Sequence, residues 1–514
     1  MAAQAPGRIQ VRPARRVPPG RPAAGHRGRA GSAVGARAWL VAAGSLVLAV
    51  AAYRSRVLSV DAFYDLYAGR YLAAHGIPQV NVLTAASHGA PWIDQQWLAH
   101  LGYYGAWALA GYPGVATVSV LLTVAGWVVL AMLMLRRGVP PTRMFAWTIT
   151  GAVVCLADYQ IQAQNFGYPL FALTLWLLLA DADADAPRPR PRTWLVVAVL
   201  VAWANLHGSV LLGVASTGLY AGRRVLQAAA RRDLRAMLGY CGLGIAALAA
   251  VACTPYGGGV LGYYLSLLGN PELPRYIARW AMPAAGDPAT WLFAAVVVAV
   301  LAALVLAWRQ GVRPDPFLGI LCAALLLLAV SAARNEDWFA FGGVLAAADA
   351  RARSSADRVP ILSRGFTSVV SGLLAAAAAA GYLGLATTTA SQFQSQAPVR
   401  AIAAAAKLAA RHPDLRILGD AYTGTSMLWL QPAATVGRDG FDVRFEQYSR
   451  RQLAAYFRFI FGRGPHWQQV TSGYQLIVIS RHSVRLSHLL TRLPGWRLVF
   501  ADPGGMVFRR TSRR

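Results

Sequence analysis

The feature that most constrains this chain is a succession of apolar runs separated by short loops. A run of about 17 to 25 apolar residues can cross a bilayer as a helix, and shorter runs can do so when flanking residues snorkel. Eleven such runs lie between Ala38 and Ala386, at residues 38–53, 115–135, 145–157, 166–180, 194–206, 210–222, 237–253, 291–308, 317–333, 338–348 and 366–386. The sequence therefore predicts a polytopic α-helical membrane protein with about 11 spans.

The distribution of charge agrees with this interpretation. The net charge of +28 would suggest nucleic-acid binding in a soluble chain, but here the arginines gather in alternate short loops. Because cytoplasmic loops are enriched in Lys and Arg, we place the N-terminus in the cytoplasm of a plasma (inner) membrane protein. With an odd number of spans, the C-terminal part falls outside. The exceptions are Arg54, Arg56 and Arg70 in the first outer loop and Arg275 and Arg279 in the fourth.

The two ends of the chain differ from the apolar middle. Residues 1–37 contain eight arginines and no acid, so we expect a disordered basic cytoplasmic tail and no cleaved signal peptide. Residues 38–388 form the transmembrane domain, with a long first outer loop at 54–114. Residues 389–514 are predicted to form an extracytoplasmic α/β domain. Its expected strands are 416–418, 475–480, 496–500 and 506–508, and its expected helices run to residue 410 and lie near 453–461 and 484–493.

Candidate catalytic groups concentrate in the first outer loop. Asp61 and Asp65 are four residues apart, so on a helix they would share a face and could hold a cation or divide the roles of base and ligand. Asp94 and Gln96 follow in the same loop. On spacing alone, a solvated acid or a helix cap is the simpler interpretation of Asp61.

This loop resembles the first-loop signature of the GT-C superfamily of membrane glycosyltransferases, whose members include protein mannosyltransferases and aminoarabinose transferases. Two segments carry the resemblance, V-D-A-F-Y-D-L-Y-A-G-R-Y-L-A-A-H-G-I-P at 60–78 and H-G-A-P-W-I-D-Q-Q-W-L at 88–98. Asp61 matches the first-loop acid. The other matching residues are Phe63, Tyr64, Gly69, Pro78, Trp92, Trp97 and Leu98. Two positions depart from the pattern: Asp65 stands where many bacterial members have His, and Gln96 where many have an acid.

Two later segments extend the resemblance. W-A-N-L-H-G-S at 203–209 contains His207, and A-R-N at 333–335 contains Arg334. The residues themselves allow simpler interpretations, a hydrogen-bonded helix-end histidine and a snorkelling arginine. The resemblance instead implies a site at a phosphate, which the guanidinium of Arg334 would clamp.

The resemblance implies a glycosyltransferase that moves a hexose or pentose from a polyprenyl-phosphate donor to a cell-envelope glycan, lipid or protein. In this interpretation Asp61 is the base, and Asp65 and Asp94 are helpers or cation ligands. The expected substrate-binding residues are Tyr64, Gln96, Trp97, His207 and Arg334. A divalent cation is a candidate cofactor, with Asp61 and Asp65 as candidate ligands. Membrane lipids are expected partners and nucleic acid is not. The alternatives are a lipid or solute transporter or flippase, and a non-catalytic scaffold for envelope assembly.

Overall fold

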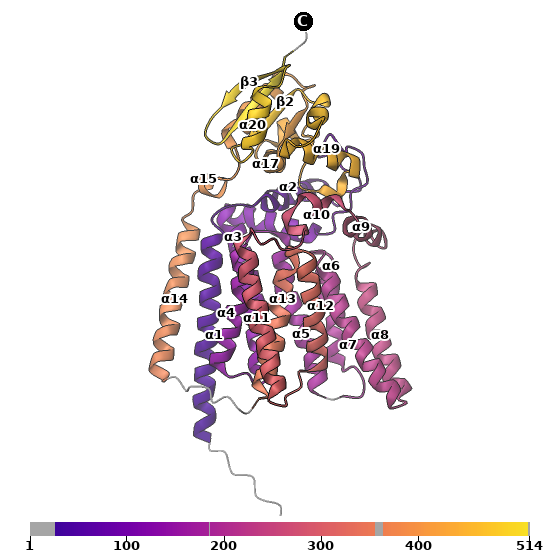
Figure 1. Cartoon of the computed structure of the whole chain (residues 1–514), viewed down its shortest axis with the longest axis vertical. Coiled ribbons are helices and arrows are strands. Elements are labelled where there is room, and N and C mark those ends of the chain that lie inside the picture. The colour runs from indigo at the N-terminus through magenta and orange to yellow at the C-terminus, as the bar shows by residue number, and fades with distance from the viewer. Residues whose placement is uncertain (1–25, 185, 355–362, 512–514) are drawn as a thin grey trace, which may run out of the picture.

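A computed structural model describes residues 26–184, 186–354 and 363–511 of the chain. It has a bundle of helices with a small sheet-containing region over one end, while helix α1 (His26–Arg54) begins at the opposite end (Figure 1). Residues 26–37, predicted to be disordered, therefore belong to a helix. The rest of the predicted basic tail, residues 1–25, lies outside the described residues.

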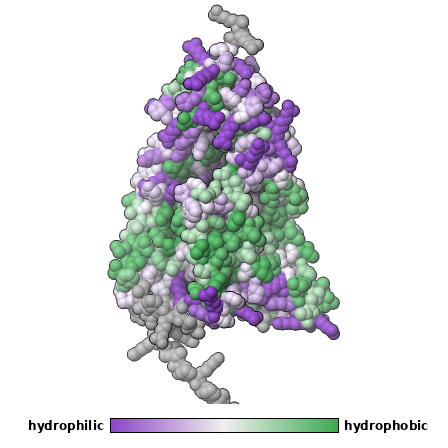
Figure 2. Space-filling view, in the orientation of Figure 1, coloured by the Kyte–Doolittle hydropathy of each residue, from purple (hydrophilic) through white to green (hydrophobic). Residues whose placement is uncertain are grey.

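Each of the predicted apolar runs coincides with a helix. Besides α1, these helices are α3 (Trp97–Arg136), α4 (Pro141–Ala157), α5 (Gly167–Asp183), α6 (Leu195–Ala204), α7 (Val210–Ala230), α8 (Leu234–Ala250), α11 (Pro288–Arg309), α12 (Pro316–Ser331), α13 (Glu336–Ala352) and α14 (Arg364–Ala386). In the described part of the chain, five helical segments are long and apolar enough to cross a membrane by length and composition. On the face shown in Figure 2, an apolar belt crosses the bundle, with polar residues above and below it. The membrane fold is confirmed, and the number of spans stays a prediction.

Helix α13 lies at the centre of the bundle, which explains why its apolar run is short. Every residue from Glu336 to Ala350 is buried. Small residues such as Gly342 and the Ala346–Ala348 stretch keep the helix surface flat, so neighbouring helices approach closely. This helix begins directly after Arg334, which is thereby placed at the end of the bundle that faces the sheet region.

Helix α3 is two helices joined at a break. Ala110 and Gly111 have non-helical backbone angles, and Gly111 has a φ of 61°, which glycine adopts without strain. Pro113 follows in the first turn of the second part, where its missing N–H has no helical partner to lose. The predicted span at 115–135 corresponds to the second part, and the first part belongs to the first outer loop.

The first outer loop contains helix α2 (Val60–His75), which packs on the first part of α3. Ser59 caps α2 by accepting the backbone N–H of Ala62. The two helices approach most closely at Gly69, where a Cβ atom would lie 2.2 Å from the carbonyl oxygen of His100. Only glycine fits this crossing without a shift of the backbone.

We therefore expect Gly69→Ala to lower the free energy of unfolding by about 1–3 kcal/mol, the usual cost of overpacking. The measurement is the thermal unfolding of the purified protein in detergent. Gly105→Ala on α3 is the matched control, since a Cβ there meets no atom within 4 Å. Equal unfolding temperatures for Gly69→Ala and the wild type would contradict the close crossing.

The C-terminal region is a small α/β unit. Its strands are β1 (Ile417–Gly419), β2 (Leu476–Ser480), β3 (Trp496–Ala501) and β4 (Gly505–Arg510), in the order β1-β2-β4-β3. The β1–β2 pair is parallel and the others are antiparallel. The four predicted strands are confirmed, as are the helices α16 (Val399–Arg411), α19 (Arg450–Phe461) and α20 (Val484–Thr491). Helix α17 (Ala421–Leu430) was not predicted.

Buried polar contacts hold this C-terminal region on the first outer loop. The hydroxyl of Tyr67 donates to Asp442 at 2.6 Å, and Arg444 donates to Asn81 at 2.9 Å. Arg444 is fully buried, paired with Asp442 at 2.7 Å, and stacked over the ring of Trp92. Breaking these contacts would leave charges buried without partners, so the two parts are firmly joined.

The arginine distribution and the opposite positions of α1 and the sheet region lead to a test of topology. We expect Ser395→Cys and Ser472→Cys, both exposed, to react with a membrane-impermeant maleimide on intact cells. Ala230→Cys, at the exposed C-terminal end of α7, should react only after permeabilisation. The background must lack the native cysteines, since Cys241 and Cys253 are exposed. If Ser472→Cys were labelled only in permeabilised cells, the C-terminal region would lie in the cytoplasm and the predicted orientation would be wrong.

Candidate active site

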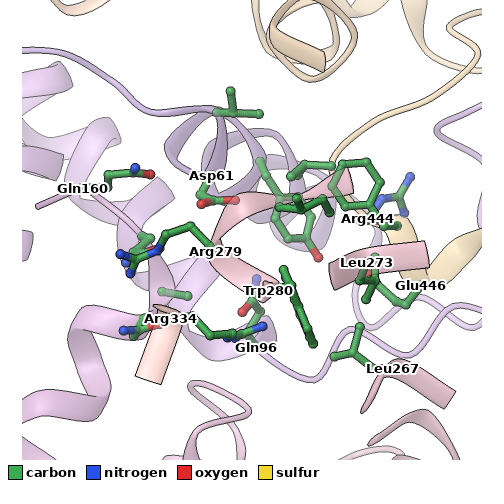
Figure 3. Close-up of a pocket in the computed structure, with 18 of the residues that line it drawn as sticks. Asp61, Gln96, Gln160, Leu267, Leu273, Arg279, Trp280, Arg334, Arg444 and Glu446 are labelled. Carbon is green, nitrogen blue, oxygen red and sulfur yellow. The ribbon is translucent and has the colours of Figure 1, made fainter. Parts of the chain in front are cut away.

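A cavity of about 460 Å³ lies where three parts of the chain meet (Figure 3). These parts are the first outer loop, the short helices α9 (Gly259–Leu268) and α10 (Glu272–Tyr276), and the C-terminal region. Residues far apart in the chain line this cavity together. Among them are seven residues predicted from the sequence: Asp61, Tyr64, Asp65, Asp94, Gln96, His207 and Arg334. The fold thus gathers most of the predicted site into one chamber.

Trp97 is the predicted substrate-binding residue that the structure places elsewhere. It does not belong to the described lining of this cavity. Its indole N–H donates to the side-chain oxygen of Asn205 at 2.8 Å, and Asn205 in turn donates to the backbone of Val201 and Cys253. Trp97 therefore fastens the start of α3 to the end of α6, and its part in the site is structural support.

Asp61 lies in the first turn of α2 and faces two arginines. Burial raises the pKa of its carboxyl group, while the positive charges of Arg334 and then Arg279 oppose the rise. In Figure 3 the guanidinium groups of Arg279 and Arg334 lie on the same side of the cavity as Asp61, and Arg444 and Glu446 lie on the other. The carboxylate thus stands beside a strongly positive part of the chamber.

The two arginines differ in how they are held. Arg279 pairs with Asp158 at 2.7 Å and lies 3.9 Å from Asp337. Arg334 stacks over the ring of Trp280 at 4.0 Å, and within the described residues no carboxylate forms a salt bridge with it. Burial lowers the pKa of Arg334 to about 10, with Arg279 the next cause, so the group still carries its charge at neutral pH. A guanidinium oriented by stacking and lacking a carboxylate partner can bind an anionic ligand.

His207 is a neutral hydrogen-bond donor. Its Nδ1 accepts the backbone N–H of Ser209 at 3.1 Å and lies 2.8 Å from the hydroxyl of Ser209. Because Nδ1 is an acceptor, the ring proton is on Nε2. Burial lowers the pKa of His207 to about 3, with the charge of Arg334 the next cause. This ring can donate to an oxygen of a ligand but does not serve as a proton shuttle near neutral pH.

A second cavity of about 520 Å³ adjoins the first on the side of the helix bundle. The two share Gln95, Gln164, His207, Leu267, Trp280 and Arg334. The second cavity is otherwise lined mainly by apolar residues, among them Leu211, Leu212, Leu268, Leu328 and Trp338. Arg334 and His207 therefore stand at the junction of an apolar chamber and a chamber rich in carboxylates.

Two of the predicted catalytic acids flank a histidine. His100, in the first part of α3, lies with Nε2 3.3 Å from Asp65 and with Nδ1 3.0 Å from Asp94. All three side chains are almost completely buried. In the described parts of the chain, no group of three His, Cys, Asp or Glu side chains is arranged to hold a metal ion. The predicted role of Asp61 and Asp65 as cation ligands stays a prediction.

Several site residues were not expected from the sequence. Arg279 had been noted only as an exception to the charge rule, yet it lines the cavity with Trp280. Glu446, from the C-terminal region, also lines it, and burial raises the pKa of this carboxyl group to about 7. One indication of this role was present in the sequence: Arg279 is a positive charge in an outer loop, where arginine is not expected.

Comparison with solved structures identifies the architecture. No protein-family model and no curated protein matches the sequence. The oligosaccharyltransferase AglB of Archaeoglobus fulgidus, in complex with an inhibitory peptide and a dolichol-phosphate, superposes with a TM-score of 0.51 at 11% identity, over 91% of this chain and 74% of its own. The chain has the GT-C fold. ArnT of Cupriavidus metallidurans bound to undecaprenyl phosphate gives a TM-score of 0.49 at 15% identity, over 92% of this chain and 98% of its own.

This fold brings polar residues from distant parts of the chain close together. The first outer loop and the C-terminal region meet at one end of the helix bundle (Figure 1). The cavity is lined there by Asp61, Asp65 and Asp94 of that loop and by Arg334, which precedes α13. The predicted fold class is confirmed. At 11% identity the likeness extends to the fold alone, so the activity must be argued from the site itself.

Proposed function

We propose that this chain is a membrane glycosyltransferase that transfers a sugar from a polyprenyl-phosphate donor to an extracytoplasmic acceptor. The observation that carries the proposal is the position of Arg334, which lacks a carboxylate partner and stands between an apolar chamber and a chamber containing Asp61. A lipid phosphate has a matching division, with a long apolar chain on one side of the phosphate and a sugar on the other. The dolichol-phosphate bound by AglB supports this choice of ligand class.

The residues then divide the chemistry between them. The isoprenoid chain occupies the apolar cavity, Arg334 and Arg279 face the phosphate, and the Nε2–H of His207 donates to one of its oxygens. Asp61 removes the proton from the acceptor hydroxyl as its oxygen attacks the anomeric carbon. The bond from that carbon to the phosphate oxygen breaks, and the phosphate leaves with the electron pair. The result is transfer with inversion.

The orientation and the division of the chain belong to the same proposal. Residues 38–388 form the membrane domain, residues 389–514 form the extracytoplasmic domain, and the cavity opens on the outer side of the plasma membrane. The acceptor reaches the cavity through the side lined by Phe445, Glu446 and Phe457. The acceptor is a glycan, lipid or protein of the cell envelope.

The test is radiolabelled sugar transfer by the purified chain in lipid vesicles. Polyprenyl-phosphate sugars serve as donors and extracted envelope material as the acceptor. We expect a labelled product that requires both the donor phosphate and the acceptor. If the protein moves labelled lipid between leaflets and forms no product with any donor, it is a transporter or flippase. If it does neither, it is a scaffold, and the proposal fails in both cases.

A further inference from the structure

His100 is a buried ionisable group beside the cavity that has no task in the proposed reaction. It does not line either described cavity, so it stands behind the site rather than in it. Asp65 and Asp94, however, do line the first cavity. The histidine therefore contacts the wall of the chamber from outside.

The arrangement of its two ring nitrogens fixes its charge. One nitrogen faces Asp65 at 3.3 Å and the other faces Asp94 at 3.0 Å. A neutral imidazole has a single N–H, so one of the two carboxylates would then face a lone pair. When both carboxylates are ionised, the imidazolium is the form that directs an N–H and a positive charge toward each of them. Burial lowers the pKa of His100, but Asp94 and Asp65 outweigh this effect and raise the pKa to about 9. The edge of Tyr64 packs against the ring with centroids 4.5 Å apart and holds its plane.

The two carboxylates have little other support. Neither oxygen of Asp65 and only one oxygen of Asp94 has a properly aligned hydrogen-bond partner among the described residues. Burial raises the pKa of Asp65 to about 6, and the contact with His100 opposes the rise. A pair of buried ionised carboxylates is stabilised by a positive charge between them, which in many proteins is a divalent cation.

We propose that His100 is a positioning residue that takes the place of a bridging cation, joining Asp65 and Asp94 as an imidazolium and so fixing the wall beside Asp61. Gly69 makes this possible, because it lets α2 and α3 approach until His100 lies next to Asp65. The position of Asp61, one helical turn before Asp65, is then set by the same contact. The inference rests on the proposed function only where activity is measured.

The first arm of the test needs no activity. Mn²⁺ binding to the full chain in detergent is followed by electron paramagnetic resonance for the wild type, His100→Ala and the double variant His100→Ala with Asp65→Asn. We expect His100→Ala to bind one additional Mn²⁺ that the double variant and the wild type do not bind, with added imidazole displacing it. The proposal is overturned if His100→Ala gains no site, or if the wild type already binds a Mn²⁺ ion that the double variant does not bind.

The second arm measures sugar transfer. We expect wild-type transfer to be insensitive to a chelator, and His100→Ala to lose roughly 10- to 100-fold, the usual effect of removing a supporting contact in a site. Added Mn²⁺ or imidazole should restore part of the lost transfer activity. A variant that is inactive only because it is misfolded would not recover in this way. Loss of wild-type transfer on chelation, or unchanged transfer by the variant, overturns the proposal. If His100→Ala does not fold, His100→Gln replaces it in both arms, because a neutral amide also leaves the carboxylates without a cation. A wild type inert with every donor refutes the proposed function and leaves the first arm decisive.

Discussion

Replacing Asp61 by Asn is expected to lower the rate of sugar transfer by about a hundredfold or more, the scale of losing a general base. Asn has nearly the size of Asp but cannot accept the proton of the acceptor hydroxyl. Binding of the donor should survive, since in the proposed reaction Arg334 and His207, not Asp61, hold the phosphate. The measurement is kcat and KM in the vesicle transfer assay, where the loss should fall on kcat.

The role of Asp61 as the base also predicts the direction in which kcat changes with pH. The base acts only when ionised, and burial raises the pKa of Asp61, so kcat should rise as pH increases through that raised value. Asp287→Asn is the matched control, because Asp287 caps α11 by accepting the N–H of Ala289, and Asn can do the same. We expect Asp65→Asn to cost less than Asp61→Asn. Full activity in Asp61→Asn would remove the assignment of the base.

Replacing Arg334 by Gln is expected to weaken binding of a polyprenyl phosphate by about 10- to 150-fold. This range corresponds to the 1.5–3 kcal/mol of a hydrogen bond to a charged group. The guanidinium forms no salt bridge among the described residues, so its removal breaks no ion pair, and Arg279 still opposes the pKa rise of Asp61. The measurement is the equilibrium binding of a fluorescent polyprenyl phosphate to each variant.

Two comparisons separate this effect from a general loss of lipid affinity. Uncharged polyprenol should bind the wild type and Arg334→Gln equally. Arg275→Gln is the matched control, since Arg275 is exposed and does not line either described cavity. If Arg334→Gln bound the lipid phosphate as tightly as the wild type, the phosphate would have to lie elsewhere.

The fold could be predicted from the sequence because its main determinants are local. Each apolar run is a helix, and the alternating pattern of the C-terminal region located its strands, since hydropathy and side-chain periodicity act within a few residues. Helix α17 was missed for the opposite reason. Its start depends on Asp420, whose carboxylate accepts from Thr423 nearby but also from Ser480 and Ser483 far along the chain.

The candidate site was predictable where a residue's role can be read from its own neighbourhood in the sequence. Asp61 lies shortly after the first apolar run and Arg334 directly after another, and both line the cavity. His100 was not predictable, because its role is defined by Asp65 on one helix and Asp94 in a loop. Arg279 was misread because its partners Asp158 and Asp337 come from two other helix ends.

The cavity draws its walls from two parts of the chain that can change independently. Its donor side, with Arg334 and His207, is built from the packed helix bundle, where most substitutions disturb many neighbours. Its acceptor side includes Phe445 and Glu446, which lie in a connecting segment of the C-terminal region. Over evolutionary time such a protein can change its acceptor by drift in the C-terminal region while its lipid donor stays the same. Among relatives, we therefore expect the residues equivalent to 443–461 to diverge fastest around this cavity.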